Sequence, residues 1–286
     1  MKIISNIAEF KEHIAQVKQN GLTIGFVPTM GALHAGHQSL VEKARIENEY
    51  CVVSIFVNPT QFNNSTDLAK YPRTLESDAQ LLEKTGCDLI FAPESNDIYS
   101  DYEISQTFDF DFKGLDQVME GQFRPGHFNG VVQIVSKLFS LVQPDKSYFG
   151  EKDFQQLAII HLMVKELNLN IEIIDCPIVR EASGLAMSSR NERLSPEQRI
   201  IAANISKVLF ESRNFVPAKS PKETIDWVKE EIDLIHGLEL EYFEIANSIN
   251  LKTAKSWSEP TVGCIAVFCG EVRLIDNIRY KQISVE

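Results

Sequence analysis

Apolar runs of strand length alternate with helically spaced segments over the first part of the chain. Helical spacing at residues 8–20, 37–48 and 74–86 separates continuous apolar runs at residues 22–28, 50–58 and 87–93. The third helix is expected to end at its glycine. Strands that are apolar on both faces are typical of a parallel sheet covered by helices on both sides.

The same order returns after a less regular stretch at residues 94–126. Within that stretch, the alternating "FDFDF" of residues 108–112 predicts a short edge strand. Further helices are predicted at residues 128–143 and 153–168, and further strands at 146–150 and 171–179. The pattern therefore predicts an α/β fold with a Rossmann-like, doubly wound parallel sheet.

A change in composition marks the expected domain boundary. The segment "REASGLAMSSRNERLSPEQ" is polar, rich in small residues and ends in a Ser-Pro helix start. Beyond it, helices at 196–213 and 221–235 and strands at 240–246, 264–269 and 272–276 predict a smaller C-terminal α+β domain. We therefore expect two domains, residues 1–180 and 181–286.

Composition narrows the functional classes. With 286 residues, 44% of them hydrophobic, the chain can bury a sizeable core, and no stretch approaches the roughly 18 apolar residues of a membrane helix. The net charge of -12 argues against a nucleic-acid groove or an anionic membrane surface. The five cysteines lie singly in or beside strand-like runs, which favours buried thiols over a zinc site or a disulfide framework. We expect a cytoplasmic protein.

The stretch "PTMGALHAGH" (residues 28–37) occupies the first predicted turn from strand to helix. In an open parallel sheet this turn is a favoured phosphate site, because helix N-terminal amides point at the anion. Gly31 and Gly36 would let a phosphate chain approach the backbone, while His34 and His37 would share one helical face. Imidazoles there would donate hydrogen bonds to phosphate or, as cations, oppose its charge. Zinc ligation and simple capping are the alternatives for the two histidines.

Polar residues also follow two other strands. "FVNPTQF" (56–62) places Asn58 and Gln61 at the end of the second strand, where their amides would suit a hydroxyl-bearing substrate or would simply form a turn. "YFGEKDFQQL" (148–157) places Lys152 near a helix start. A cation opposes the dipole there, so Lys152 indicates a nearby anion unless it is an ordinary surface lysine.

Two loops carry further candidate groups. "MSSRN" (187–191) offers two hydroxyls and a guanidinium that could clamp phosphate, although serine-rich loops are often only loops. "RPGHFNGV" (124–131) presents Arg124 and His127 before a helix, where the pair is either catalytic or structural, with the structural reading slightly favoured.

Taken together, these motifs resemble one family over nearly the whole chain. In order and spacing, "PTMGALHAGH", "FVNPTQF", "YPRT", "RPGHFNGV", "FGEKDFQQL", "MSSRN" and "RLIDN" resemble the pantothenate synthetases, the ligases of pantoate and beta-alanine. The first motif is also similar to the signature of class I aminoacyl-tRNA synthetases and nucleotidylyltransferases. The resemblance implies that pantoate attacks the α-phosphorus of ATP, and that beta-alanine then attacks the pantoyl adenylate to give pantothenate and AMP. It also implies a homodimer, Mg²⁺ on the triphosphate with no protein ligand assigned, and a C-terminal domain that closes over ATP as a lid.

The resemblance also implies roles for individual residues. The ATP site would comprise Met30, Gly31, Ala32, Leu33, His34, Ala35, Gly36, His37, Gly150, Glu151, Lys152, Asp153, Val179, Met187, Ser188, Ser189 and Arg190. Of these, His37, His34, Lys152 and Arg190 would be catalytic. Pantoate would be held by Gln61 and Gln156, with Asn58 supporting the pocket.

Two departures and two alternatives accompany this interpretation. Ala35 stands where relatives often have an acidic residue, and residues 99–105 lack a turn that is common in the family. The first alternative function is a nucleotidylyltransferase that leaves AMP on a phosphate-bearing product, which would need cations where this chain offers amides. The second is a non-catalytic module in which ATP only closes the two domains.

Overall fold

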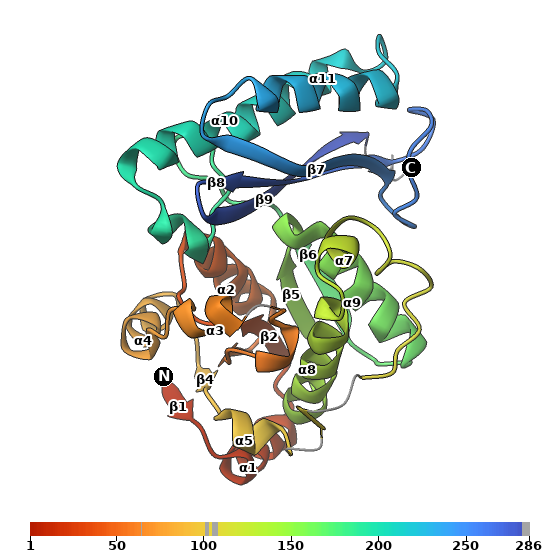
Figure 1. Ribbon diagram of the computed structural model, residues 1–286. Helices are drawn as coiled ribbons and strands as arrows, with labels where there is room; N and C mark the ends of the chain where they lie inside the picture. The colour runs from red at the N-terminus through yellow and green to blue at the C-terminus, as the bar shows by residue number, and fades with distance from the viewer. Residues whose placement is uncertain (64, 101–102, 105–107, 282–286) are drawn as a thin grey trace. The chain divides into compact units, whose positions relative to one another are not determined.

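The computed structural model describes residues 1–63, 65–100, 103, 104 and 108–281, and their contacts separate two compact units (Figure 1). The first unit comprises Met1–Glu151 and Gln156–Pro177, and the second comprises Lys152–Gln155 and Ile178–Glu286. Each unit has its own sheet and core.

A six-stranded parallel sheet forms the centre of the first unit. Its strands are β1 (Lys2–Ile4), β2 (Ile24–Thr29), β3 (Tyr50–Ile55), β4 (Leu89–Phe91), β5 (Lys146–Gly150) and β6 (Glu172–Cys176). Their spatial order is β1-β4-β3-β2-β5-β6, and every neighbouring pair is parallel. The chain therefore winds from β2 through β3 to β4, then returns to the other side of β2 with β5. This confirms the doubly wound fold, with its switch point between β2 and β5.

Helices cover both faces of this sheet, as the apolar pattern predicts. The helices along this part of the chain are α1 (Ile7–Gln19), α2 (Ala35–Glu47), α3 (Ser65–Lys70), α4 (Leu75–Lys84), α5 (Ser95–Ile98), α7 (Met119–Phe123), α8 (His127–Val142) and α9 (Phe154–Glu166), with short turns η1 (Pro59–Gln61) and η2 (Glu151–Asp153). Successive side chains of β2 point to opposite faces of the sheet. Phe26 packs edge-on against Phe139 of α8, whereas Val27 belongs to a hydrophobic cluster with Val41 of α2. Continuous apolar strands thus have a packing partner on each side.

The predicted glycine end of α4 is confirmed. Gly86 has φ 83°, and the next amide, of Cys87, donates to the carbonyl of Leu82 at 3.1 Å. A residue without a side chain reaches this left-handed conformation at little cost, so the chain can turn directly into β4.

The predicted edge strand at residues 108–112 is wrong, because these residues form no strand. The carbonyl of Phe108 accepts from the side chain of Asn129 in α8 at 2.8 Å instead of from a neighbouring strand. The carboxylate of Asp111 accepts from the amide of Lys113 at 2.9 Å, which starts a turn through left-handed Lys113 and Gly114. Local side-chain hydrogen bonds have replaced the sheet ladder.

The second unit is a small α+β domain, as expected. It contains η3 (Ser189–Arg193), α10 (Pro196–Ser212), η4 (Arg213–Phe215), α11 (Pro221–Asp233) and the antiparallel strands β7 (Leu238–Asn247), β8 (Thr261–Cys269) and β9 (Val272–Lys281). Figure 1 shows α10 and α11 together over one face of the β7-β8-β9 sheet. The predicted Ser-Pro start is confirmed, since Ser195 caps α10 by accepting from the amide of Gln198 at 3.2 Å.

Two further sequence expectations concern thiols and membrane helices. All five cysteines are buried and without a disulfide bond, which confirms the reading as buried thiols. In the part of the chain that the structure describes, no helix has the length and apolarity needed to cross a bilayer.

Candidate active site

The carboxyl ends of β2, β3 and β5 bring together the predicted residues of the first unit. Parallel neighbours end at the same edge of a sheet, and the order β3-β2-β5 places β2 in the middle. The histidine turn follows β2, the 58–61 turn follows β3, and Gly150 ends β5 with Glu151 directly after it. Open α/β sheets bind ligands at this edge, beside the switch point.

His34 and His37 are held by the start of α2. His34 is the N-cap, and its Nδ1 accepts from the amide of Gly36 at 3.1 Å. The amide of His34 donates to Nδ1 of His37 at 3.3 Å, and the two ring centroids are 4.1 Å apart. A ring nitrogen that accepts from an amide carries no proton, so this geometry corresponds to neutral rings with the proton on Nε2.

The residues of the turn beside the two histidines differ in their contacts and exposure. Met30 lies beside Gln61, whose Nε2 donates to the Met30 sulfur at 3.0 Å. Ala35, by contrast, is exposed. Gly31 and Ala32 both have left-handed backbones, with φ 80° and 51°.

Asn58 is the centre of a buried hydrogen-bond network. Its side chain is 1% exposed, and Nδ2 donates to Oε1 of Gln61 at 3.1 Å and to the carbonyl of Gly130 at 3.0 Å. Its Oδ1 accepts from the hydroxyls of Tyr99 at 2.9 Å and Thr60 at 3.1 Å. Both donors and both acceptor sites of the amide are therefore used within the protein. Asn58 therefore holds the side chain of Gln61 in place.

Tyr99 is a member of this network that the sequence did not reveal. Burial raises the pKa of its hydroxyl to about 12, so the group keeps its proton and donates to Asn58. It lies 41 residues from Asn58 in the chain, and no local pattern indicated the contact. Tyr99 opens the 99–105 stretch flagged as a departure, of which residues 101, 102 and 105 lie outside the described residues.

The start of α8 supports the same turn. A Cβ on Gly130 would lie 2.4 Å from the carbonyl oxygen of Thr60 and 2.6 Å from the amide nitrogen of Gln61, so only glycine allows this approach. Nδ1 of His127 is 2.8 Å from the carbonyl oxygen of Gln61. This contact gives His127 a structural role. Arg124 forms an ion pair with Glu120 at 3.4 Å.

The second predicted glutamine follows β5. Gln156 lies half-buried in the first turn of α9, whereas Gln61 follows β3. Because β2 separates these strands, the two glutamines occupy opposite sides of the strand that carries the histidine turn.

Lys152 and its neighbours belong to the second unit. The Lys152 side chain is 18% exposed, its Nζ is 3.3 Å from a carboxylate oxygen of Asp153, and its carbonyl accepts from Nδ2 of Asn277 at 3.0 Å. The adjacent Asp276 forms a bidentate pair with Arg180, with distances of 2.6 and 2.9 Å. Burial raises the pKa of Asp276, while Arg180 opposes this rise. The "RLIDN" motif thus fixes the backbone that carries the lysine.

The remaining predicted ATP ligands form one loop of the second unit. The amide of Met187 donates to the carbonyl of Val179 at 3.0 Å, and Oγ of Ser188 accepts from the amide of Arg190 at 3.3 Å. Asn191 closes the loop by donating to the carboxylate of Glu181 at 2.8 Å and to the carbonyl of Ala186 at 3.1 Å. Ser188, Ser189 and Arg190 stay half-buried.

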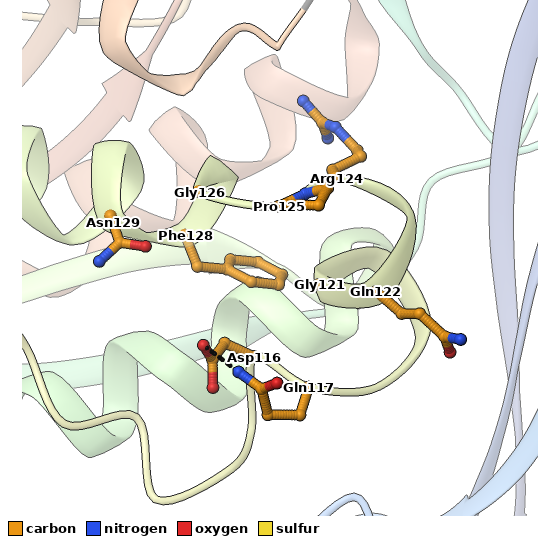
Figure 2. Close-up of a pocket in the computed structure, with 9 residues that line it drawn as sticks. All are labelled: Asp116, Gln117, Gly121, Gln122, Arg124, Pro125, Gly126, Phe128 and Asn129. Atoms are coloured by element: carbon orange, nitrogen blue, oxygen red, sulfur yellow. Dashed lines mark hydrogen bonds between the residues drawn. The ribbon is translucent and has the colours of Figure 1, made fainter. Parts of the chain in front are cut away.

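A hollow of about 300 Å³ lies elsewhere in the first unit, between α7 and the start of α8. Figure 2 shows the Phe128 ring beside it, with Asp116 and Gln117 below and the Arg124 guanidinium extending away. Of the candidate residues, Arg124 lines this hollow, and none of the residues assigned to ATP or pantoate does. Its guanidinium extends away from the other lining side chains.

A further point concerns the side chains that could bind a metal ion. Among residues 1–63, 65–100, 103–104 and 108–281, no cluster of three or more His, Cys, Asp or Glu side chains could hold a metal ion.

Comparisons with known proteins identify the family of this chain. The family model for pantoate-beta-alanine ligase matches residues 2–279. A pantothenate synthetase of Bacteroides thetaiotaomicron is 55% identical over 285 residues, covering 99% of this chain and all of the relative. The crystal structure of pantothenate synthetase from Thermus thermophilus has a TM-score of 0.92 at 39% identity, with 99% of this chain and 100% of that one covered. The ligase of Francisella tularensis, complexed with beta-gamma ATP and beta-alanine, has a TM-score of 0.81 at 37% identity, with coverage of 99% and 98%. The chain therefore belongs to the pantoate-beta-alanine ligase family.

Proposed function

We propose that this protein condenses pantoate with beta-alanine at the expense of ATP, giving pantothenate, AMP and pyrophosphate. The pantoate carboxylate attacks the α-phosphorus and pyrophosphate leaves. The amine of beta-alanine then attacks the carbonyl carbon of the pantoyl adenylate, and AMP and a proton are released. Adenylation is needed because a free carboxylate resists attack by an amine at neutral pH.

The capping geometry of His34 and His37 carries this proposal. Imidazoles that accept with Nδ1 inside the helix cap would donate through Nε2–H to phosphate oxygens, at the edge where α/β sheets bind nucleotides. Such donors would stabilise the charge that grows on the α-phosphate during attack.

Pantoate is assigned to the amides beside β2. Gln61 has its Oε1 held by Asn58, while its Nε2 donates to a thioether, which is a weak acceptor. A hydroxyl or carboxylate of pantoate is a stronger acceptor and would replace the sulfur. By resemblance, Gln156 is the second amide of this pocket.

The residues of the second unit are assigned to ATP by resemblance. Lys152 would supply an ammonium to the phosphates, and Ser188, Ser189 and Arg190 would donate to their oxygens. The C-terminal domain would act as the lid, Mg²⁺ would arrive bound to the triphosphate, and the enzyme would be a cytoplasmic homodimer. Light scattering in solution tests the dimer directly.

An AMP-release assay in which substrates are omitted in turn tests the reaction. We expect AMP only when ATP, pantoate and beta-alanine are all present, and exchange of pyrophosphate into ATP with pantoate alone. AMP that stays covalently attached to a phosphate-bearing product would instead support the nucleotidylyltransferase. Tight ATP binding without pantoate-dependent exchange would support the non-catalytic module.

A further inference from the structure

A buried carboxylate, Asp78, holds the turn that leads from β2 to the histidines. Asp78 is 3% exposed on α4, yet its two oxygens face another segment of the chain. Oδ2 accepts from the amide of Ala32 at 2.9 Å, and Oδ1 accepts from the amide of Leu33 at 2.8 Å. The hydroxyl of Thr74 donates to Oδ2 at 3.1 Å. The carboxylate therefore receives three hydrogen bonds, two of them from consecutive amides of the turn.

The turn needs such support because of its backbone conformation. Gly31 and Ala32 are both left-handed, with φ 80° and 51°, and an alanine is strained there. Consecutive amides around left-handed residues form a concavity that binds anions, and here the anion is a side chain of the protein. The approach is close enough that a Cβ on Gly31 would lie 3.1 Å from Oδ2 of Asp78. The first glycine of the motif is thus favoured by the close carboxylate as well as by its own φ.

The histidines follow directly from the held residues. Leu33, whose amide Asp78 accepts, immediately precedes His34, the N-cap of α2. The amide of His34 in turn donates to His37, so the backbone path fixed by Asp78 determines where both rings lie. An acidic residue early in a helix ordinarily serves the helix dipole from the surface. Asp78 differs because it is buried and bonded 45 and 46 residues away.

We infer that Asp78 is a positioning residue for adenylation: its carboxylate fixes the 31–33 turn, and thereby the Nε2–H groups of His34 and His37, without touching substrate. The inference rests on the proposed function, because the histidines are assigned there to the α-phosphate. Displacing a reacting group by about 1 Å can cost on the order of 100-fold in rate.

The first test is Asp78→Asn, compared with Glu76→Gln. Asparagine keeps the size but turns one acceptor into a donor that faces an amide N–H. The control removes the same charge from an exposed residue in the same first turn of α4. We expect Asp78→Asn to lower kcat for pantoate-dependent pyrophosphate exchange by about 10–100-fold, with the pantoate KM within about twofold. Glu76→Gln should match the wild type. A wild-type kcat in Asp78→Asn overturns the inference.

A spectroscopic readout separates positioning from stability. Nitrogen NMR of ring-labelled histidine reports which nitrogen carries the proton. We expect Nε2–H rings for His34 and His37 in the wild type and in Glu76→Gln, and a mixture of ring states in Asp78→Asn. Unchanged ring spectra in a folded, slow Asp78→Asn variant overturn the inference, because the loss would then not pass through the histidines.

A second substitution keeps the inference testable if Asp78→Asn folds poorly. Glycine accepts the φ of Ala32 without strain, so Ala32→Gly combined with Asp78→Asn should recover at least threefold in kcat over Asp78→Asn alone. Recovery of folded protein without recovery of kcat per folded molecule contradicts positioning. If the wild type shows no pantoate-dependent exchange, the proposed function fails, while the ring spectra still decide whether Asp78 sets the histidines.

Discussion

Replacing Gly130 with alanine sets two effects of known sign against each other. In a helix interior, alanine is favoured over glycine by about 1 kcal/mol. In α8, however, the added Cβ would lie 2.4 Å from the carbonyl oxygen of Thr60, and ordinary contact begins only near 3.4 Å. The partner is backbone and cannot rotate away, so the 59–61 turn must retreat by about 1 Å.

The structure predicts that the steric clash of the added Cβ outweighs the helix preference of alanine. Overpacking of this kind costs about 1–3 kcal/mol, and weakening the bond from Asn58 to the Gly130 carbonyl adds about 0.5–1.5 kcal/mol. After subtracting the helix preference, we expect a net loss of about 0.5–3.5 kcal/mol, which lowers the unfolding midpoint by about 1–14 °C. Because Gln61 moves with the turn, the pantoate KM should rise about tenfold.

Two measurements check this prediction. AMP release is followed with pantoate varied and ATP and beta-alanine saturating, and thermal unfolding is recorded on the same protein. Ser140→Ala, at an exposed position of the same helix, is the matched control and should change neither quantity appreciably. A Gly130→Ala variant with an unchanged KM and an unfolding midpoint at or above that of the wild type would refute the reasoning.

Three other outcomes follow from the contacts of individual side chains. Asn58→Ala should raise the pantoate KM at least tenfold, because Gln61 loses its support, and Tyr99→Phe should raise it only a few-fold; equal effects of the two in steady-state assays would contradict the network. Lys152→Ala should slow pyrophosphate release by about two to three orders of magnitude in rapid-quench experiments without moving the unfolding midpoint, and a wild-type rate would exclude the lysine from the mechanism. Glu103 has its pKa lowered from the ordinary 4.5 to about 2, first by its hydrogen bond with Lys137. Its contribution to stability is therefore present above pH 4.5 and lost toward pH 2, so Glu103→Gln should flatten the pH dependence of the unfolding midpoint in that window, and parallel pH curves for both proteins would count against it.

The order of helices and strands could be predicted because continuous apolar runs are a strong local signal. Strand β1 escaped prediction since "KII" is too short to show a period, and it exists through pairing with β4. The alternation of apolar and polar residues at 108–112 led to a wrong prediction. The two-residue period of a strand is present there, but among the described residues no strand pairs with it. Local pattern indicates the face of an element, whereas a sheet also requires a neighbour.

The candidate site was predictable where the chemistry is concentrated in short motifs. Within each of three short segments, the histidine turn, the 58–61 turn and the 187–191 loop, the polar residues lie only a few positions apart. Their spacing could therefore be read directly from the sequence. Tyr99 and Asp78 could not be found in this way. Their contacts span 41 and 46 residues of chain, and neither residue belongs to a motif in its own segment.

The central place of β2 has a consequence for how such an enzyme can be altered. The hydrogen-bond network of Asn58 and Gln61 follows β3 and is held by α8, while the histidine turn follows β2 and is held by α4. The hydrogen bond from Gln61 to the Met30 sulfur connects the network with the turn. If these residues have the roles proposed above, a laboratory selection for a bulkier acid could rebuild the loop after β3 while leaving the histidine turn intact.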